Sequence, residues 1–103
     1  MATDSYEIIL TDTAKIELEK IYEYIYNTLK EPNSASRLMK KIEADIFRLE
    51  YSPYSCSEVH IKPDNSVYRK LVSGKYIILY RVDRNHKQVI IFNVFYGKKD
   101  YLS

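Results

Sequence analysis

The sequence predicts an α+β fold in which a helical hairpin packs on one face of an antiparallel sheet, in the order β-α-α-β-β-β. Two stretches with apolar residues at helical spacing follow one another in the first half of the chain. Three stretches rich in β-branched and aromatic residues follow in the second half, separated by short turns. Because 103 residues suffice for one hydrophobic core but not for two, we expect a single domain over residues 1–103.

A short strand and a first helix are predicted at the start of the chain. Tyr6, Ile8 and Leu10 alternate with Glu7 and Thr11, which is typical of a half-buried strand. Thr11 or Thr13 can cap the helix that follows, and it should end near Leu29, because Glu31-Pro32 disfavours helical geometry. The apolar stripe of this helix consists of Ala14, Leu18, Ile21 and Ile25.

A second helix is predicted after a short link, with Asn33 or Ser34 as its cap. Glu43 and Asp45 lie two residues apart on this helix, so their side chains do not share a face, and we interpret both as solvated. The two helices form an αα-hairpin, and the apolar stripe on each requires a sheet to cover it. The stripe of the second helix consists of Ala35, Leu38, Met39, Ile42, Ile46 and Leu49.

Three strands should form an antiparallel meander in the second half of the chain. A turn-rich connector over residues 51–66 precedes them, and turns at Ser73-Gly74 and at residues 83–87 separate them. The expected strands span residues 67–72, 75–82 and 88–96. Alternate residues of a strand share a face, so Arg81 should lie on the open face, opposite the helix-facing set of Tyr76, Ile78, Tyr80 and Val82.

Charge is unevenly distributed along the chain, although the net charge is only +2. Residues 1–66 contain eight Lys/Arg and twelve Asp/Glu, whereas residues 67–103 contain eight Lys/Arg and two Asp/Glu. Such asymmetry is typical of a protein that presents one cationic face to nucleic acid or to an acidic protein. The alternative is a neutral mosaic, in which folding mixes the two halves again.

Cations and tyrosines interleave across the predicted strands. Tyr68 and Lys70 share one face of their strand, and Arg69 lies on the other. Because lysine and arginine contact phosphates and tyrosine rings stack on splayed bases, this combination suits RNA. The alternative is that edge lysines prevent aggregation and that the tyrosines belong to the core, which we favour for Tyr76 and Tyr80.

Several functional classes lack their sequence signatures. Neither GxxxxGK[ST], GxGxxG, GxSxG nor HExxH occurs, which argues against nucleotide-triphosphate enzymes and against common hydrolases. Cys56 is the single cysteine, and His60 and His86 are the two histidines, so we expect no disulfide, metal or cofactor. Glu58 and His60 are best interpreted as surface residues of a loop without a functional role, and His86 as a turn residue. The chain shows neither a signal peptide nor a membrane span, and we expect it in the cytoplasm.

Several segments occur together in a family-specific order and spacing. They are IYEYI (21–25), IFRLEYSPYS (46–55), YRKL (68–71), Gly74 with YIILYRV (76–82), and VFYGKKDYL (94–102). Through this arrangement the chain resembles the RelE/ParE superfamily of type II toxin–antitoxin toxins from Tyr6 to Leu102. The resemblance implies a cytoplasmic toxin that inhibits growth and takes part in functions such as plasmid stabilisation.

The resemblance implies one of two targets. ParE-like members block DNA gyrase, whereas RelE-like members enter the ribosome and cleave mRNA as metal-independent mRNA interferases. The long helical hairpin, the LEYSPYS element (49–55) and the GKKDY run (97–101) favour the ParE-like activity. The alternatives are a ribosome-dependent mRNA endonuclease and a non-toxic partner-binding module of the same fold.

The resemblance also implies candidate site residues. In a RelE-like enzyme the catalytic groups would be Lys70, Tyr96, Lys99 and Tyr101. The arginine that such enzymes carry in the middle strand is replaced here by Ile77, which cannot stabilise an oxyanion. Residues predicted to bind nucleic acid or the target are Arg69, Lys75, Arg81 and Lys98. The implied partner is a cognate antitoxin, acidic and partly disordered, that covers the hairpin and the sheet.

Overall fold

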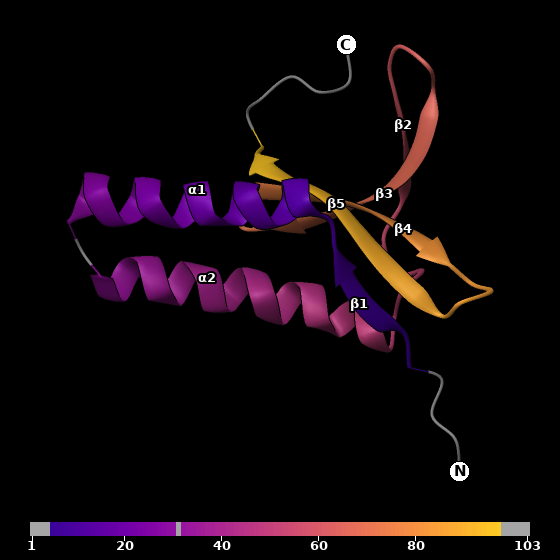
Figure 1. The fold of residues 1–103 in the computed structure, drawn as a ribbon, viewed down its shortest axis with the longest axis horizontal. Helices are drawn as coiled ribbons and strands as arrows, with labels where there is room; N and C mark the ends of the chain where they lie inside the picture. Colours follow the sequence, from indigo (N-terminus) through magenta and orange to yellow (C-terminus); the bar gives the residue numbers. More distant parts are fainter. Residues whose placement is uncertain (1–4, 31, 98–103) are drawn as a thin grey trace.

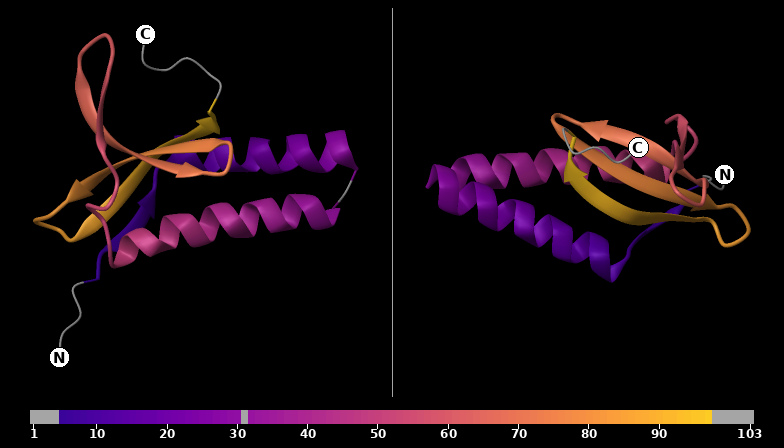
Figure 2. Two further views of the ribbon diagram at one scale, coloured as in Figure 1. Left: turned by 180° about the vertical axis from the view of Figure 1, so that it is seen from behind. Right: turned by 90° about the horizontal axis from the view of Figure 1, so that it is seen from above.

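The computed structural model of the chain describes residues 5–30 and 32–97, which form two layers (Figure 1). One layer is a hairpin of two antiparallel helices, α1 (Asp12–Leu29) and α2 (Pro32–Phe47), with the short 3-10 helix η1 (Arg48–Glu50) after it. The other layer is a sheet of β1 (Glu7–Leu10), β2 (Glu58–Ile61), β3 (Ser66–Ser73), β4 (Tyr76–Asp83) and β5 (Gln88–Tyr96). The hairpin extends well beyond the sheet at the end where α1 leads into α2 (Figure 2).

The strands are arranged in the order β1-β5-β4-β3-β2. The predicted α+β class with a helical hairpin on a sheet is confirmed, and so is the antiparallel meander of β3, β4 and β5. The sheet is nevertheless mixed, because β1 pairs with β5 in parallel. Parallel neighbours require a long crossover connection, and here the whole chain between residues 10 and 88 supplies it.

The predicted connector over residues 51–66 contains an additional strand, β2, which pairs antiparallel with β3. Its side chains alternate between exposed Glu58 and His60 and half-buried Val59 and Ile61, which is the period of a strand. Only four residues long and followed by Pro63, this strand lies at the edge of the sheet, where short strands and prolines are tolerated. The order of elements is therefore β-α-α-β-β-β-β.

The helix termini follow local chemistry. Thr11 caps α1 as predicted, because its Oγ1 accepts a hydrogen bond from the Ala14 N–H at 3.1 Å. The end of α1 at Leu29 also agrees with the prediction. The predicted cap of α2 at Asn33 or Ser34 is wrong, since this helix already begins at Pro32. Proline fits the first helical position because its fixed φ is helical and its missing N–H would have no helical partner there.

The core lies between the hairpin and one face of the sheet. Ile78 and Tyr80 of β4 are fully buried there, and Arg81 is exposed, as the strand periodicity predicted. The Tyr80 hydroxyl donates to the Pro53 carbonyl at 2.8 Å, and burial raises the pKa of this hydroxyl. The buried members of the core cluster are Ala14, Ile42, Ile46, Leu49, Leu71, Ile78, Tyr80, Val89, Ile91 and Val94.

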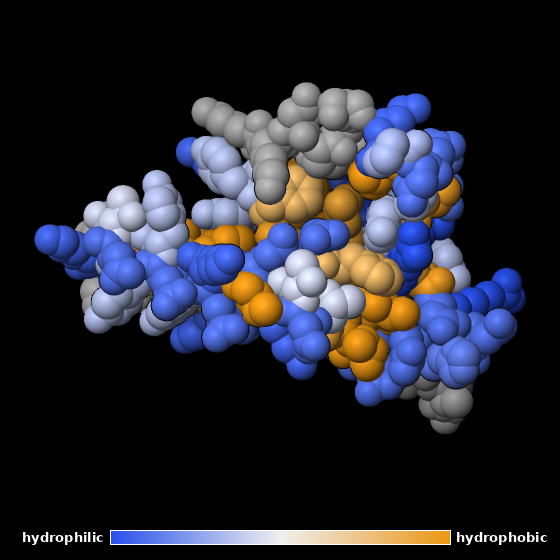
Figure 3. Space-filling view, turned by 45° about the horizontal axis from the view of Figure 1, so that its top comes forward, coloured by the Kyte–Doolittle hydropathy of each residue, from blue (hydrophilic) through white to orange (hydrophobic). Residues whose placement is uncertain are grey.

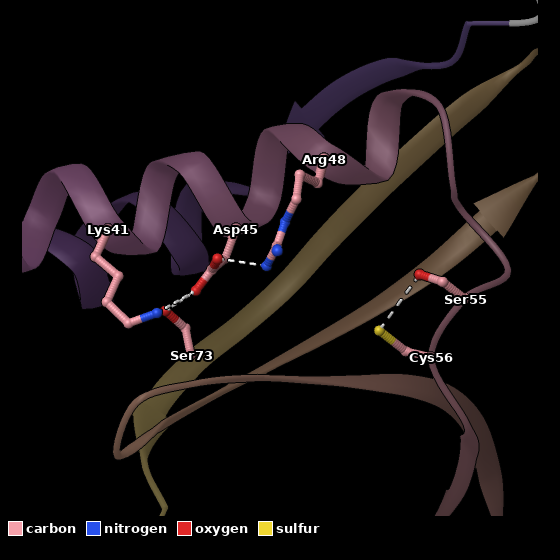
Figure 4. Close-up of polar contacts among 6 residues, drawn as sticks. All are labelled: Lys41, Asp45, Arg48, Ser55, Cys56 and Ser73. Carbon is pink, nitrogen blue, oxygen red and sulfur yellow. Dashed lines mark hydrogen bonds and ion pairs between the residues drawn. The ribbon is translucent and has the colours of Figure 1, made fainter.

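The interpretation of Asp45 as a solvated residue is wrong, whereas Glu43 is exposed as expected. Asp45 is only 7% exposed and points from α2 toward the end of β3 (Figure 4). Its Oδ2 accepts hydrogen bonds from Ser73 Oγ at 2.6 Å and Lys41 Nζ at 3.0 Å, and its Oδ1 accepts one from Arg48. The hydrogen bond from Ser73, followed by Lys41 and Arg48, lowers the pKa of Asp45 against the opposing effect of desolvation.

No helix in the described part of the chain is long and apolar enough to cross a membrane. Among residues 5–30 and 32–97, no three histidine, cysteine, aspartate or glutamate side chains lie together as a metal site would require.

Candidate functional site on the open face of the sheet

The face of the sheet that points away from the hairpin is called here the open face. In β3 it carries Tyr68, Lys70 and Val72, because Leu71 of the same strand points into the core. In β4 the residues opposite Lys70 and Val72 are Leu79 and Ile77. Both side chains are nearly buried, at 5% and 7% exposure, so the middle of the open face is apolar.

Arg81 is the centre of a cluster on the open face, which we call the Arg81 stack and which consists of Tyr68, Arg81 and Phe92. The guanidinium carbon of Arg81 lies 4.2 Å from the centroid of the Tyr68 ring and 5.2 Å from that of Phe92. The two rings contact each other edge to face at 5.5 Å. The Nε of Arg81 donates to the Val67 carbonyl at 3.1 Å, which fixes the direction in which the guanidinium points.

Phe92 belongs to the Arg81 stack because β5 contains a bulge. Leu79 of β4 pairs with Asn93, whereas the next residue, Tyr80, pairs with Ile91, so Phe92 is the extra residue. This bulge differs from the prediction, in which residues 88–96 (QVIIFNVFY) form a regular strand. A polar Asn93 inside an otherwise apolar run is the signal that could have indicated it.

Arg69 and Lys70 are neighbours in sequence but lie on opposite faces of the sheet. Arg69 pairs with Tyr80 of β4, on the side of the hairpin. Its NH1 donates to the Cys56 carbonyl at 2.6 Å, its NH2 lies 3.5 Å from Glu58 Oε2, and its guanidinium lies 4.9 Å from the Tyr54 ring centroid. These contacts attach the connector between η1 and β2 to the sheet.

Tyr96 lies on the side of the hairpin and not beside Lys70. Its ring contacts the Tyr76 ring edge to face at 5.7 Å, and its side chain is 40% exposed. Burial, followed by the neighbouring tyrosines, raises the pKa of Tyr76. Both tyrosines line a groove of about 510 Å³ against α1, together with Lys20, Ile21 and Tyr24. The structure therefore does not bring the two described members of the RelE-like catalytic set together on one face.

Lys75 and Gly97 fix the point at which the last described strand ends. The Gly97 N–H donates to the Lys75 carbonyl at 2.7 Å, and a Cβ on Gly97 would lie 2.9 Å from the same oxygen. Only glycine fits such a close backbone approach without movement of its neighbours. The side chain of Lys75 is exposed on the turn between β3 and β4. Lys98, Lys99 and Tyr101 lie outside the described residues.

The remaining polar candidates are surface residues. Glu58 and His60 are exposed on β2, and Glu58 lies beside Arg69. His86 lies in the turn between β4 and β5, and its Nδ1 lies 2.8 Å from Asp83 Oδ2. Hydrogen bonds from His86 lower the pKa of Asp83. Figure 3 shows apolar patches across the middle of the molecule and a hydrophilic surface at the free end of the hairpin.

Comparisons with known proteins identify the family from the sequence and the fold from solved structures. Residues 8–101 match the sequence model described as "ParE toxin of type II toxin-antitoxin system, parDE". The chromosomal ParDE toxin–antitoxin system of P. aeruginosa contains a similar fold, with 17% identity and a TM-score of 0.72 over 91% of this chain and 98% of that one. The RelBE2 toxin–antitoxin complex of Mycobacterium tuberculosis gives 22% identity and a TM-score of 0.65, over 89% and 91%. No functionally curated protein sequence matches the chain.

Proposed function

Because the chain belongs to the ParE toxin family of type II toxin–antitoxin systems, we propose that it inhibits growth by blocking DNA gyrase. The observation that carries this proposal is the composition of the open face beside Lys70. The positions opposite and next to this lysine are occupied by Leu79, Val72 and Ile77. Cleavage of RNA requires groups that stabilise the charge developing on the phosphate, and these apolar side chains cannot do so.

The separation of Lys70 from Tyr96 also favours inhibition by binding over cleavage. General acid–base catalysis requires both groups within hydrogen-bond reach of the reacting atoms. Lys70 lies on the open face, whereas Tyr96 lines the groove against α1 on the other side of the sheet. A toxin that acts by binding a protein target needs a complementary surface, but it does not need catalytic groups close to one another.

Gyrase inhibition is tested directly with purified components. The chain, added in excess to DNA gyrase and relaxed plasmid, should prevent the ATP-dependent introduction of supercoils. Mixing the chain first with its cognate antitoxin should restore supercoiling, which serves as the control for specific inhibition. Undiminished supercoiling in the presence of excess folded chain would contradict the proposal.

A second candidate function is ribosome-dependent mRNA cleavage. The observation that favours it is the pair of cations on the open face, Lys70 and Arg81, with Tyr68 between their positions. In this case Lys70 and Tyr96, together with Lys99 and Tyr101, would supply the catalytic groups. Primer extension on translated mRNA should then show cuts within codons that disappear in Lys70→Ala and persist in Lys15→Ala, which removes an exposed lysine of α1.

The proposal includes the setting in which the toxin acts. We expect a cytoplasmic protein that needs neither metal nor cofactor, and a module that contributes to plasmid stabilisation. The partner would be an acidic, partly disordered antitoxin that orders on binding. Target contacts would come from Lys75 and Lys98, whereas Arg69 is engaged by the connector.

A further inference from the structure

We propose that the Arg81 stack is a preformed binding site for one carboxylate of the cognate antitoxin, and that Thr11 and Glu17 of the α1 region hold it in shape. The inference rests on membership of a toxin–antitoxin family and does not depend on gyrase as the target. It assigns Arg81 to the neutralising partner and not to the cellular target.

The geometry of Arg81 is suited to a carboxylate. One face of its guanidinium lies over the Tyr68 ring, Phe92 flanks it, and its Nε is engaged by the Val67 carbonyl. A guanidinium fixed in this way keeps its terminal N–H groups in one orientation, and two parallel hydrogen bonds to a carboxylate then cost little further ordering.

Arg81 has no ion-paired carboxylate among the described residues, unlike Arg48 and Arg69 but like Arg37 and Arg84. Arg48 is paired with Asp45, and Arg69 lies beside Glu58. Within residues 5–30 and 32–97, Arg81 makes no ion pair although it is exposed. Its charge is thus available to a partner.

The surroundings of Arg81 favour a peptide carboxylate over a nucleic acid. A hollow of about 250 Å³ adjoins it, and the apolar parts of its lining include Val67, which is 40% exposed, and Val82. Glu58 lies in the same lining. The Asp64 pKa is lowered, mainly by hydrogen bonds from Ser66 and to a smaller extent by the Arg81 charge, so a second carboxylate is near. Glu58 is paired with Arg69 of the same lining, so Arg81 is the cation of this hollow that has no ion pair among the described residues. One such cation beside apolar side chains suits a single acidic side chain better than a polyanion, which requires several cations.

The start of α1 holds the bulge that places Phe92 in the stack. A bulge interrupts the ladder and leaves backbone groups in need of other partners. The Thr11 Oγ1 donates to the Phe92 carbonyl at 3.2 Å. The Glu17 Oε1 accepts from the Val94 N–H at 2.8 Å and from Asn93 Nδ2 at 3.4 Å. Both side chains therefore act as positioning residues, since they act through β5 and do not themselves reach Arg81.

The first test measures the affinity of the full chain for its purified cognate antitoxin by titration calorimetry. Loss of a charge-assisted bidentate contact in Arg81→Ala should weaken binding about 10-fold to 100-fold. Arg81→Lys, which keeps the charge but not the planar guanidinium group, should have an affinity between those of the wild type and Arg81→Ala. Arg84→Ala, which removes an exposed cation from the nearby β4–β5 turn, is the matched control and should bind like the wild type.

The partner carboxylate is identified by a double-mutant cycle. Each Asp and Glu of the antitoxin is replaced in turn by Asn or Gln, and one replacement should weaken binding to the wild type but not to Arg81→Ala. Equal effects of every replacement on both proteins would overturn the proposal. So would binding of a short single-stranded oligoribonucleotide that is lost in Arg81→Ala while affinity for the antitoxin is unchanged.

The positioning role is tested with Glu17. Glu17→Ala should weaken antitoxin binding about threefold to tenfold and shift the NMR resonance of the Arg81 side-chain Nε–H, which lies in the ring current of Tyr68. Glu17→Gln should restore both, because its amide oxygen can still accept from Val94 N–H. Glu19→Ala is the exposed control on the same helix. A loss of affinity without a shift of this resonance would refute the positioning role.

Growth assays separate this inference from the proposed function. Arg81→Ala should still arrest growth, but co-expressed antitoxin should relieve the arrest less well than in the wild type. If the wild type does not inhibit gyrase, the proposed function fails and the affinity measurements still decide the role of Arg81. If Arg81→Ala abolishes toxicity and leaves antitoxin affinity unchanged, the assignment made here is wrong.

Discussion

The two faces of the sheet use their charged residues in different ways. On the face toward the hairpin, Arg69 is held by the Cys56 carbonyl, Glu58 and the Tyr54 ring, and Asp45 reaches Ser73 at the end of β3. On the open face, Arg81 is held by aromatic rings and a carbonyl, but it makes no ion pair with the described residues. Charges on the hairpin side thus stabilise the fold, whereas the charge of Arg81 remains available for binding.

The largest difference in stability between the two faces should come from replacing apolar residues of β4. Ile78→Ala removes a fully buried side chain from the core cluster and should destabilise the protein by about 3–4 kcal/mol. Leu79→Ala, from the open face, should cost about 2 kcal/mol, at the lower end of the range for a buried leucine, because the hairpin covers the other face of the sheet. Urea unfolding followed by circular dichroism measures both, and equal losses would mean that the open face is a second core.

Removal of the buried carboxylate should have the next largest effect. Asp45→Ala leaves Ser73 without its hydrogen-bond acceptor and Lys41 and Arg48 without their ion-pair partner, so we expect a loss of stability of about 2–3 kcal/mol. Glu43→Ala, on the exposed side of the same helix, should change stability by less than about 0.5 kcal/mol. The free energies of unfolding of the two variants provide the comparison.

Replacing Arg69 should mainly reduce the stability of the protein, whereas replacing Arg81 should mainly reduce its affinity for the antitoxin. Arg69→Ala should cost about 1–2 kcal/mol of stability, because it loses its hydrogen bond to Cys56 and its contact with Tyr54. Arg81→Ala should cost about 0.5 kcal/mol or less, since its side chain is exposed. If Arg81→Ala proves the more destabilising variant, Arg81 is a structural residue and the distinction between the faces is lost.

The smallest effect is the pH dependence of the Asp45 contribution. The pKa of Asp45 is lowered in the folded state, so its contribution to stability is fully present above the unfolded value of about 3.8 and is lost as the pH falls through the folded pKa. The urea midpoints of wild type and Asp45→Asn should therefore converge as the pH is lowered from 6 toward 3. A constant difference over this range would show that Asp45 titrates normally.

The elements of the fold were predictable because their signals are local. Helical spacing around Ile42 and alternation around Ile78 depend only on neighbouring residues. The position of Asp45 could also have been inferred, because it lies three residues after Ile42 and four before Leu49, on the buried stripe itself. Its polarity led to the wrong interpretation, since a buried carboxylate requires partners such as Ser73 from another element.

The candidate site was less predictable because it depends on contacts between distant segments. Alternation placed Arg81 on the open face, but nothing near it in the sequence indicates Phe92 as its neighbour. That neighbour depends on the bulge and on Thr11 and Glu17, which are more than seventy residues away in sequence. The predicted roles of Lys98, Lys99 and Tyr101 lie outside the described residues and stay predictions.

The turn between β3 and β4 acts as a mechanical link between the two ends of the fold. Ser73, where the turn begins, is attached to α2 through Asp45, and Lys75, where it ends, is attached to Gly97. If a bound partner displaces α2, we expect these two hydrogen bonds to carry the displacement to residue 97. A spin-label pair on Lys40 of α2 and on Tyr96 would report such a displacement as a shift of one narrow distance distribution.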